Sequence, residues 1–180
     1  SPPSIEAGVY LLRKRTLDFS RGEGGVGAPN LFIEARAGQG KSVLAAQWVA
    51  QTQRPFAWYR IDTADADPIT FISELTHALE GAFPGFRCVA LEEILAAGES
   101  SLADTRRMTE LLLTELSAHL PQPSYLVLDD LHRLGDSAPG WEVVRSLVSC
   151  STPPVRLVLT SRIPITPFLV PAQPLRDALI

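Results

Sequence analysis

The sequence has few of the features that are typical of disulfide-rich secreted proteins, zinc-binding domains or membrane-spanning proteins. Its two cysteines, Cys88 and Cys150, lie far apart and form no CxxC pair. This usage is typical of reduced thiols and argues against a disulfide framework or a zinc site. No apolar run approaches the roughly 18 residues of a membrane span, and the N-terminus lacks the layout of a signal peptide. We therefore expect a cytoplasmic location and no membrane contact.

Charge of one sign is not concentrated in any stretch. The formal net charge is −4 at pH 7, and the basic residues are scattered. Nucleic-acid binding needs a clustered basic patch, so we expect no direct nucleic-acid contact by this segment. Of the 16 basic residues only Lys14 and Lys41 are lysines. Because lysine is so scarce, Lys41 in a glycine-rich loop is difficult to explain as an ordinary surface residue without a function.

Apolar runs alternate with helical patterns along the 180 residues, of which 46% are hydrophobic. This length and composition suit a single domain with a full core. Buried strands are predicted at residues 31–33, 56–61, 125–128 and 155–160. Helices are predicted at residues 43–50, from 68 through 79, at 102–120 and at 141–148. Strands that alternate with helices predict an α/β fold with a parallel sheet and right-handed crossovers.

The N-terminal 30 residues are predicted to differ from this core. An amphipathic pattern at residues 5–19 predicts a helix, and a glycine-rich loop follows at residues 20–30. Residues 22–27 match the dinucleotide pattern GxGxxG. We interpret them as a surface loop. The dinucleotide fingerprint follows a strand and opens a helix, whereas this segment follows a predicted helix and leads into a predicted strand.

A phosphate-binding loop is predicted at residues 35–42, between the strand at 31–33 and the next helix. Such a loop directs successive backbone N–H groups at an anion, and the positive end of the helix dipole adds to the attraction. The loop departs from the usual pattern at its first position, where Ala35 replaces glycine. The chain is therefore predicted to contain an N-terminal helix and loop (1–30) and one P-loop nucleotide-binding core (31–180).

Individual residues of this loop can be assigned roles. Gly38 and Gly40 supply backbone freedom. Lys41 would reach the β- and γ-phosphates, and the Ser42 hydroxyl would complete a Mg²⁺ shell. The predicted nucleotide cradle consists of Ala35, Arg36, Ala37, Gly38, Gln39, Gly40, Lys41, Ser42 and Val43.

Two adjacent carboxylates, Asp129 and Asp130, follow the predicted strand at 125–128. The carboxyl ends of parallel strands converge on one crevice, so Asp129 is expected to approach Ser42. Mg²⁺ is usually held by one or two carboxylates with phosphates and water, and we assign Asp129 and Ser42 to the metal. Asp130 is assigned as the general base that polarises an attacking water. Adjacent acids also form ordinary turns, so a structural role stays open.

Arg162, just after the strand at 155–160, is the candidate sensor. A guanidinium at this edge could contact the γ-phosphate and stabilise charge in the transition state, together with Lys41 and Asp130. The alternative is a surface arginine at a strand end. His132, close after the acidic pair, is interpreted mainly as a loop residue.

Three aspartates, Asp62, Asp65 and Asp67, resemble a calcium loop in composition. They lack the glycine at the sharp turn and the distal glutamate of an EF-hand. Helix capping before Pro68 is the preferred interpretation. At the other end of the chain, prolines argue against a regular helix; they are Pro164, Pro167, Pro171 and Pro174.

Four segments together resemble the nucleotide-binding domain of STAND-class signal-transduction ATPases, in particular the MalT-like branch of large LuxR-family transcriptional activators. They are residues 35–42 with the downstream Gln47 and Trp48, 58–68 leading to Phe71, 126–132, and 159–164. The phosphate loop alone is shared by very many enzymes. The later segments at these separations are far more specific.

The resemblance implies a three-layer P-loop NTPase fold with the sheet order 5-1-4-3-2. Its last strand would be incomplete, because residues 175–180 could only begin it. The implied function is an ATP/ADP switch with Mg²⁺ and slow hydrolysis. We expect a fragment of a larger protein that lacks helical, winged-helix, sensor and DNA-binding regions and that self-associates in a nucleotide-dependent way. In this class an N-terminal segment such as residues 9–15 often borders the adenine, and no adenine-contacting residue is assigned here.

Two other functions would use the same loop. A small-molecule P-loop kinase would need an acceptor pocket and usually an arginine-bearing lid, and no lid is evident between Pro121 and Arg162. A nucleotide-gated scaffold would bind ATP or ADP without turnover. The sequence favours the weakly hydrolysing switch and leaves both alternatives open.

Overall fold

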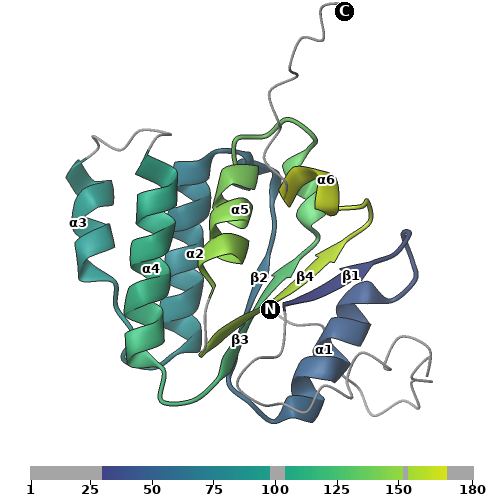
Figure 1. The fold of residues 1–180 in the computed structure, drawn as a ribbon, viewed down its shortest axis with the longest axis horizontal. Coiled ribbons are helices and arrows are strands. Elements are labelled where there is room, and N and C mark those ends of the chain that lie inside the picture. Colours follow the sequence, from purple (N-terminus) through teal and green to yellow (C-terminus); the bar gives the residue numbers. More distant parts are fainter. Residues whose placement is uncertain (1–29, 98–103, 152–153, 170–180) are drawn as a thin grey trace, which may run out of the picture.

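The computed structural model describes residues 30–97, 104–151 and 154–169. In this part of the chain one parallel sheet has the order β1-β4-β3-β2 (Figure 1). Its strands are β1 (Leu31–Glu34), β2 (Phe56–Arg60), β3 (Ser124–Asp129) and β4 (Val155–Ser161). The order of these strands agrees with the sequence-based expectation. The described residues contain no fifth strand beside β1, and residues 175–180, where it was expected to begin, lie outside them.

Helices cover both faces of the sheet. The α-helices are α1 (Lys41–Thr52), α2 (Pro68–Ala82), α3 (Val89–Ala97), α4 (Thr105–His119), α5 (Trp141–Cys150) and α6 (Thr166–Leu169), and the 3₁₀ helices are η2 (Thr63–Ala66) and η4 (Leu131–Leu134). Helix α1 packs on one face, whereas α2, α4 and α5 cover the other and α3 lies outside α4 (Figure 1). This arrangement confirms the three-layer α/β fold.

The core has two parts because successive strand residues point to opposite faces. On β3, Leu126 and Leu128 join the larger cluster with α2, α4 and α5. Tyr125 and Val127 pack instead with α1. Every residue of β3 and of β4 is buried. Both strands therefore appear in the sequence as largely apolar runs, and both end at the same edge of the sheet.

The three aspartates before Pro68 cap helices, as expected. Asp67 is the N-cap of α2, and its carboxylate accepts a hydrogen bond from the Thr70 N–H at 2.8 Å. Asp62 and Asp65 form a reciprocal capping box around η2. These bonds satisfy N–H groups that have no partner inside their helices. They fix the turn that leads from β2 into α2.

The expectation of no helix among the C-terminal prolines is wrong for one turn, α6. Pro167 is its second residue, where the missing N–H has no acceptor within the helix. The Phe168 ring stacks on Trp141 with 4.5 Å between ring centroids, and Arg145 donates to the Phe168 carbonyl at 3.0 Å. Tertiary packing thus stabilises a turn too short for a periodic pattern.

Some expectations fall on residues that the structure does not describe. These are the helix at 5–19, the segment at 9–15, the glycine-rich loop at 20–29 and the region of Pro171 and Pro174. Among the helices of the described ranges, none is long and apolar enough to cross a membrane.

Candidate nucleotide-binding site

The loop between β1 and α1 turns at Gly38 and Gly40, whose φ angles are 75° and 74°. Left-handed backbone costs other residues roughly 1–2 kcal/mol, which explains glycine at both positions. Gly40 is also the N-cap of α1, and within the described chain no side chain caps this helix. The first turn of α1 contains no acidic residue. Its free N–H groups and the helix dipole are therefore available to an anion.

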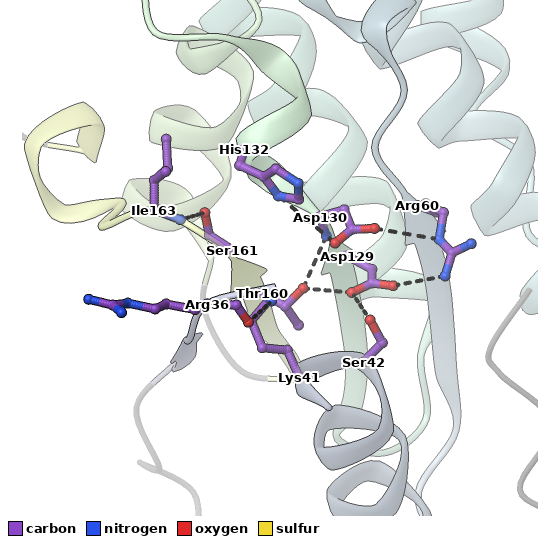
Figure 2. A network of polar contacts seen from close by, with 10 residues as sticks. All are labelled: Arg36, Lys41, Ser42, Arg60, Asp129, Asp130, His132, Thr160, Ser161 and Ile163. Atoms are coloured by element: carbon purple, nitrogen blue, oxygen red, sulfur yellow. Dashed lines mark hydrogen bonds and ion pairs between the residues drawn. The ribbon is translucent and has the colours of Figure 1, made fainter. Parts of the chain in front are cut away.

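The Lys41 ammonium lies inside the curve of this loop. The residue is only 6% exposed, and its Nζ donates to the Arg36 carbonyl at 3.3 Å (Figure 2). The Gln39 side-chain oxygen accepts from the Arg36 N–H at 3.1 Å. Hydrogen bonds between residues of the loop therefore stabilise its conformation. The loop also places one buried positive charge beside the start of α1.

The loop and the acidic strand end meet directly, as the sequence predicts. The Ser42 hydroxyl donates to Asp129 Oδ1 at 2.8 Å, although the two residues are 87 positions apart. Asp129 is the last residue of β3 and is fully buried. On the neighbouring strand, the Thr160 hydroxyl donates to the same Oδ1 at 2.6 Å. Two hydroxyl donors from two elements thus orient this carboxylate (Figure 2).

The second oxygen of Asp129 has a different environment. Oδ2 is buried and has no hydrogen-bond partner among the described residues. It faces Arg60 Nη2 at 3.5 Å. A buried carboxylate oxygen that accepts no hydrogen bond is costly, and it is a ligand suited to Mg²⁺ or to its water shell. The described residues include no group of three or more His, Cys, Asp or Glu that could hold a metal. Mg²⁺ here would therefore depend on phosphate and water ligands as well.

Asp130 has a left-handed backbone, with φ 65° and ψ 41°, and is the N-cap of η4. Its N–H donates to Thr160 Oγ1 at 3.0 Å. Its carboxylate lies 4.0 Å from Arg60 Nε and 3.9 Å from His132 Nδ1. The Thr160 hydroxyl therefore joins both acids, since it accepts from the backbone of one and donates to the side chain of the other.

His132 lies among charged groups of this edge. Burial lowers the pKa of His132; the Asp130 carboxylate opposes this shift, and the positive charges of Arg162 and Lys41 reinforce it. The folded protein thus favours the neutral ring, whereas the unfolded chain binds a proton more readily. This residue therefore reduces stability as the pH falls below about 6.5, the pKa of an unperturbed histidine.

Arg162 follows β4 and is exposed. Within the described chain its guanidinium forms no hydrogen bond or ion pair, but its charge lowers the pKa of His132. The structure thus brings Arg162 to the edge that holds the loop and the acids. The assigned roles of Lys41, Asp130 and Arg162 in catalysis stay predictions, as do those of Ser42 and Asp129 at the metal.

Sequence reasoning missed Arg60 and Thr160. Both lie at the ends of predicted strands, so the convergence of strand ends that identifies Asp129 applies to them as well. The sequence gives no sign of which face each one presents. In the structure, Arg60 is the register partner of Asp129, and Thr160 reaches Asp129 from the other side.

We expect Thr160→Val to destabilise the protein by about 1–3 kcal/mol, because it leaves the Asp130 N–H without its acceptor and the buried Asp129 carboxylate with one donor fewer. Thr109→Val is the matched control. Thr109 is equally buried, but its hydroxyl only donates to the Thr105 carbonyl of its own helix. Urea denaturation of both variants checks this difference, and an equal loss of stability would contradict the bridging role.

Comparison with known proteins places the chain in a family. Residues 20–162 match the family model described as nephrocystin 3, N-terminal. The HTH-type transcriptional regulator MalT of Serratia proteamaculans is 32% identical over 149 residues, which is 83% of this chain and 16% of the relative. MalT of Vibrio cholerae is 31% identical over 137 residues, or 73% of this chain and 14% of the relative.

A relative of another kind is the serine/threonine-protein kinase PknK of Mycobacterium tuberculosis, 31% identical over 140 residues. That match covers 75% of this chain and 12% of the relative. The chain thus spans a small part of the length of all these proteins. The matched span of the family model covers most of the chain and contains the loop, both acids and the end of β4. The protein therefore belongs to the nephrocystin 3, N-terminal family and is a MalT-like P-loop domain of the STAND class.

Proposed function

We propose that this domain binds ATP and ADP with Mg²⁺ and acts as a slowly hydrolysing regulatory switch in a cytoplasmic, signal-responsive transcriptional activator. The contact between Ser42 Oγ and Asp129 Oδ1, at 2.8 Å, carries the proposal. It joins a helix N-terminus suited to phosphate with a buried carboxylate suited to a divalent cation. A hydroxyl and a carboxylate at this separation can share one Mg²⁺ shell, which neutralises phosphate charge.

The loop would bind the phosphates through its backbone N–H groups and one charged side chain. Lys41 would exchange the Arg36 carbonyl, its acceptor at 3.3 Å, for phosphate oxygens. An anionic acceptor forms a stronger hydrogen bond with an ammonium than a neutral carbonyl does. The cradle comprises residues 35–43, and the uncapped start of α1 lies at its centre.

Hydrolysis would use Asp130 to orient and deprotonate water and Arg162 to contact the γ-phosphate. Two observations support a slow reaction. The Asp130 carboxylate already faces Arg60 and His132, which compete with a water for it. Arg162 is exposed and is not held by the described chain, so it must be ordered during each turnover. Catalytic groups that are not preorganised contribute less to the rate.

The regulatory part of the proposal rests on the relatives. MalT is named a transcriptional regulator, and the chain matches 14–16% of its length in two species. Helical, winged-helix, sensor and DNA-binding regions of the same protein would supply the response, and nucleotide-dependent self-association would transmit it. A nucleotide shifts a conformational equilibrium only if it contacts the two states differently. Regions beyond this domain would provide that difference.

We predict that Lys41→Ala weakens ATP binding about 10- to 150-fold, because a hydrogen bond to a charged group contributes about 1.5–3 kcal/mol. Isothermal titration calorimetry with ATP and Mg²⁺ measures the change. Arg87→Ala, which removes a positive charge paired with Glu92 rather than with the loop, is the control and should retain wild-type affinity. Equal affinity of Lys41→Ala and the wild type would refute phosphate binding by this lysine.

We predict that Asp130→Asn lowers phosphate release from ATP by about 10²-fold or more, while ATP affinity stays within a few-fold, because the amide cannot accept the proton of the attacking water. Single-turnover phosphate release checks the rate, and calorimetry checks binding. Asp136→Asn, an exposed acid beyond η4, is the control. Unchanged phosphate release in Asp130→Asn would exclude the general-base role. If the wild type binds ATP tightly but releases no phosphate, the result would favour a nucleotide-gated scaffold.

A further inference from the structure

Arg60 reaches the buried acid of the site from the neighbouring strand. It is the last residue of β2 and the register partner of Asp129 at the end of β3. Its Nη2 lies 3.5 Å from Asp129 Oδ2, and its Nε lies 4.0 Å from Asp130 Oδ2 (Figure 2). The Arg60 side chain is 51% exposed, whereas that of Asp129 is 0% exposed. A half-exposed guanidinium is therefore paired with a fully buried carboxylate.

The two carboxylate oxygens of Asp129 have different partners. Oδ1 accepts hydrogen bonds from Ser42 and Thr160. Oδ2 is buried and accepts no hydrogen bond from the described residues, so Arg60 is its ion-pair partner. A buried carboxylate remains charged only where positive charge or hydrogen-bond donors replace water. Arg60 thus supplies the positive charge at the one oxygen of Asp129 that hydroxyl donors leave free.

We propose that Arg60 is the counter-cation of Asp129 in the metal-free state, and that Mg²⁺ competes with it for this carboxylate. The inference rests on the proposed function, because it needs Mg²⁺ and nucleotide at Ser42. A dication beside Asp129 repels a guanidinium a few ångströms away. The half-exposed side chain of Arg60 can withdraw toward water, whereas Asp129 cannot. Arg60 therefore raises the Mg²⁺ concentration at which the nucleotide-bound state forms.

The direct test is the Mg²⁺ dependence of ADP binding by the intact protein. ADP is used because it lacks a γ-phosphate that Arg60 could contact. At a fixed, saturating ADP concentration, Arg60→Gln should lower the half-saturating Mg²⁺ concentration about 3- to 10-fold, since one repelling charge is gone. Arg60→Lys keeps the charge and should stay within about twofold of the wild type. Arg87→Gln, which alters a remote ion pair with Glu92, should change nothing.

A second readout separates competition from a merely structural role. In EDTA without nucleotide, Arg60→Gln should melt at a lower temperature than the wild type, because Asp129 Oδ2 has lost its counter-charge. Mg²⁺ with ADP should raise the melting temperature of this variant more than that of the wild type, since the dication replaces the missing charge. If Arg60→Gln is unfolded in EDTA, Mg²⁺ with ADP should restore its folding.

The outcomes distinguish the two proposals. If the wild type binds ADP in a Mg²⁺-dependent way and Arg60→Gln needs the same or a higher Mg²⁺ concentration, the competition is refuted and the proposed function stands. Failure of Mg²⁺ with ADP to stabilise or refold Arg60→Gln under those conditions also refutes it. If the wild type shows no Mg²⁺-dependent ADP binding, the proposed function fails, and the role of Arg60 fails with it.

Discussion

The buried carboxylate of Asp129 is the constraint on which the arrangement of this domain depends. It lies at the end of a central strand and is fully buried, so the chain must supply the partners that water cannot. Ser42 at the start of α1, Thr160 on β4 and Arg60 on β2 contact it from three elements. The position of the loop and the register of both strands flanking β3 are therefore tied to one negative charge.

The glycine-rich loop at residues 35–42 and this carboxylate lie side by side and carry opposite charge. The start of α1 and Lys41 present positive charge, whereas Asp129 and Asp130 present negative charge across the Ser42 hydroxyl. In the structure each charge is satisfied within the protein, Lys41 by the Arg36 carbonyl and Asp129 by Arg60 and two hydroxyl groups. In the proposed nucleotide complex, phosphate would replace the Arg36 carbonyl as the partner of Lys41, and Mg²⁺ would replace Arg60 as the partner of Asp129. Both contacts would therefore differ between the nucleotide-bound and the nucleotide-free protein.

Much of the fold could be predicted because its signals are local. The buried strands β3 and β4 appear as largely apolar runs, and the aspartates before α2 are ordinary capping residues. The contact between Ser42 and Asp129 follows from the rule that parallel strand ends converge. The helical turn at Pro167 could not be predicted, because stacking of Phe168 on Trp141 stabilises it.

The positions of Arg60 and Thr160 depend on tertiary contacts of the same kind. Both residues lie near the ends of correctly predicted strands, and only the assembled sheet shows that Arg60 is the register partner of Asp129 and that Thr160 donates to it. The left-handed backbone of Asp130 also depends on the fold, since its N–H is bonded to Thr160. Strand patterns identify the edge of the sheet, whereas the contacts of each side chain require the assembled sheet.

The most direct measurement is a crystal structure of the intact protein with ADP and Mg²⁺. Our proposal predicts the β-phosphate against the start of α1, Lys41 Nζ on a phosphate oxygen rather than on the Arg36 carbonyl, and Mg²⁺ bound by Ser42 Oγ with Asp129 in its inner or outer shell. Nucleotide bound away from residues 35–43, or a Mg²⁺ ion that contacts neither Ser42 nor the shell of Asp129, would contradict it.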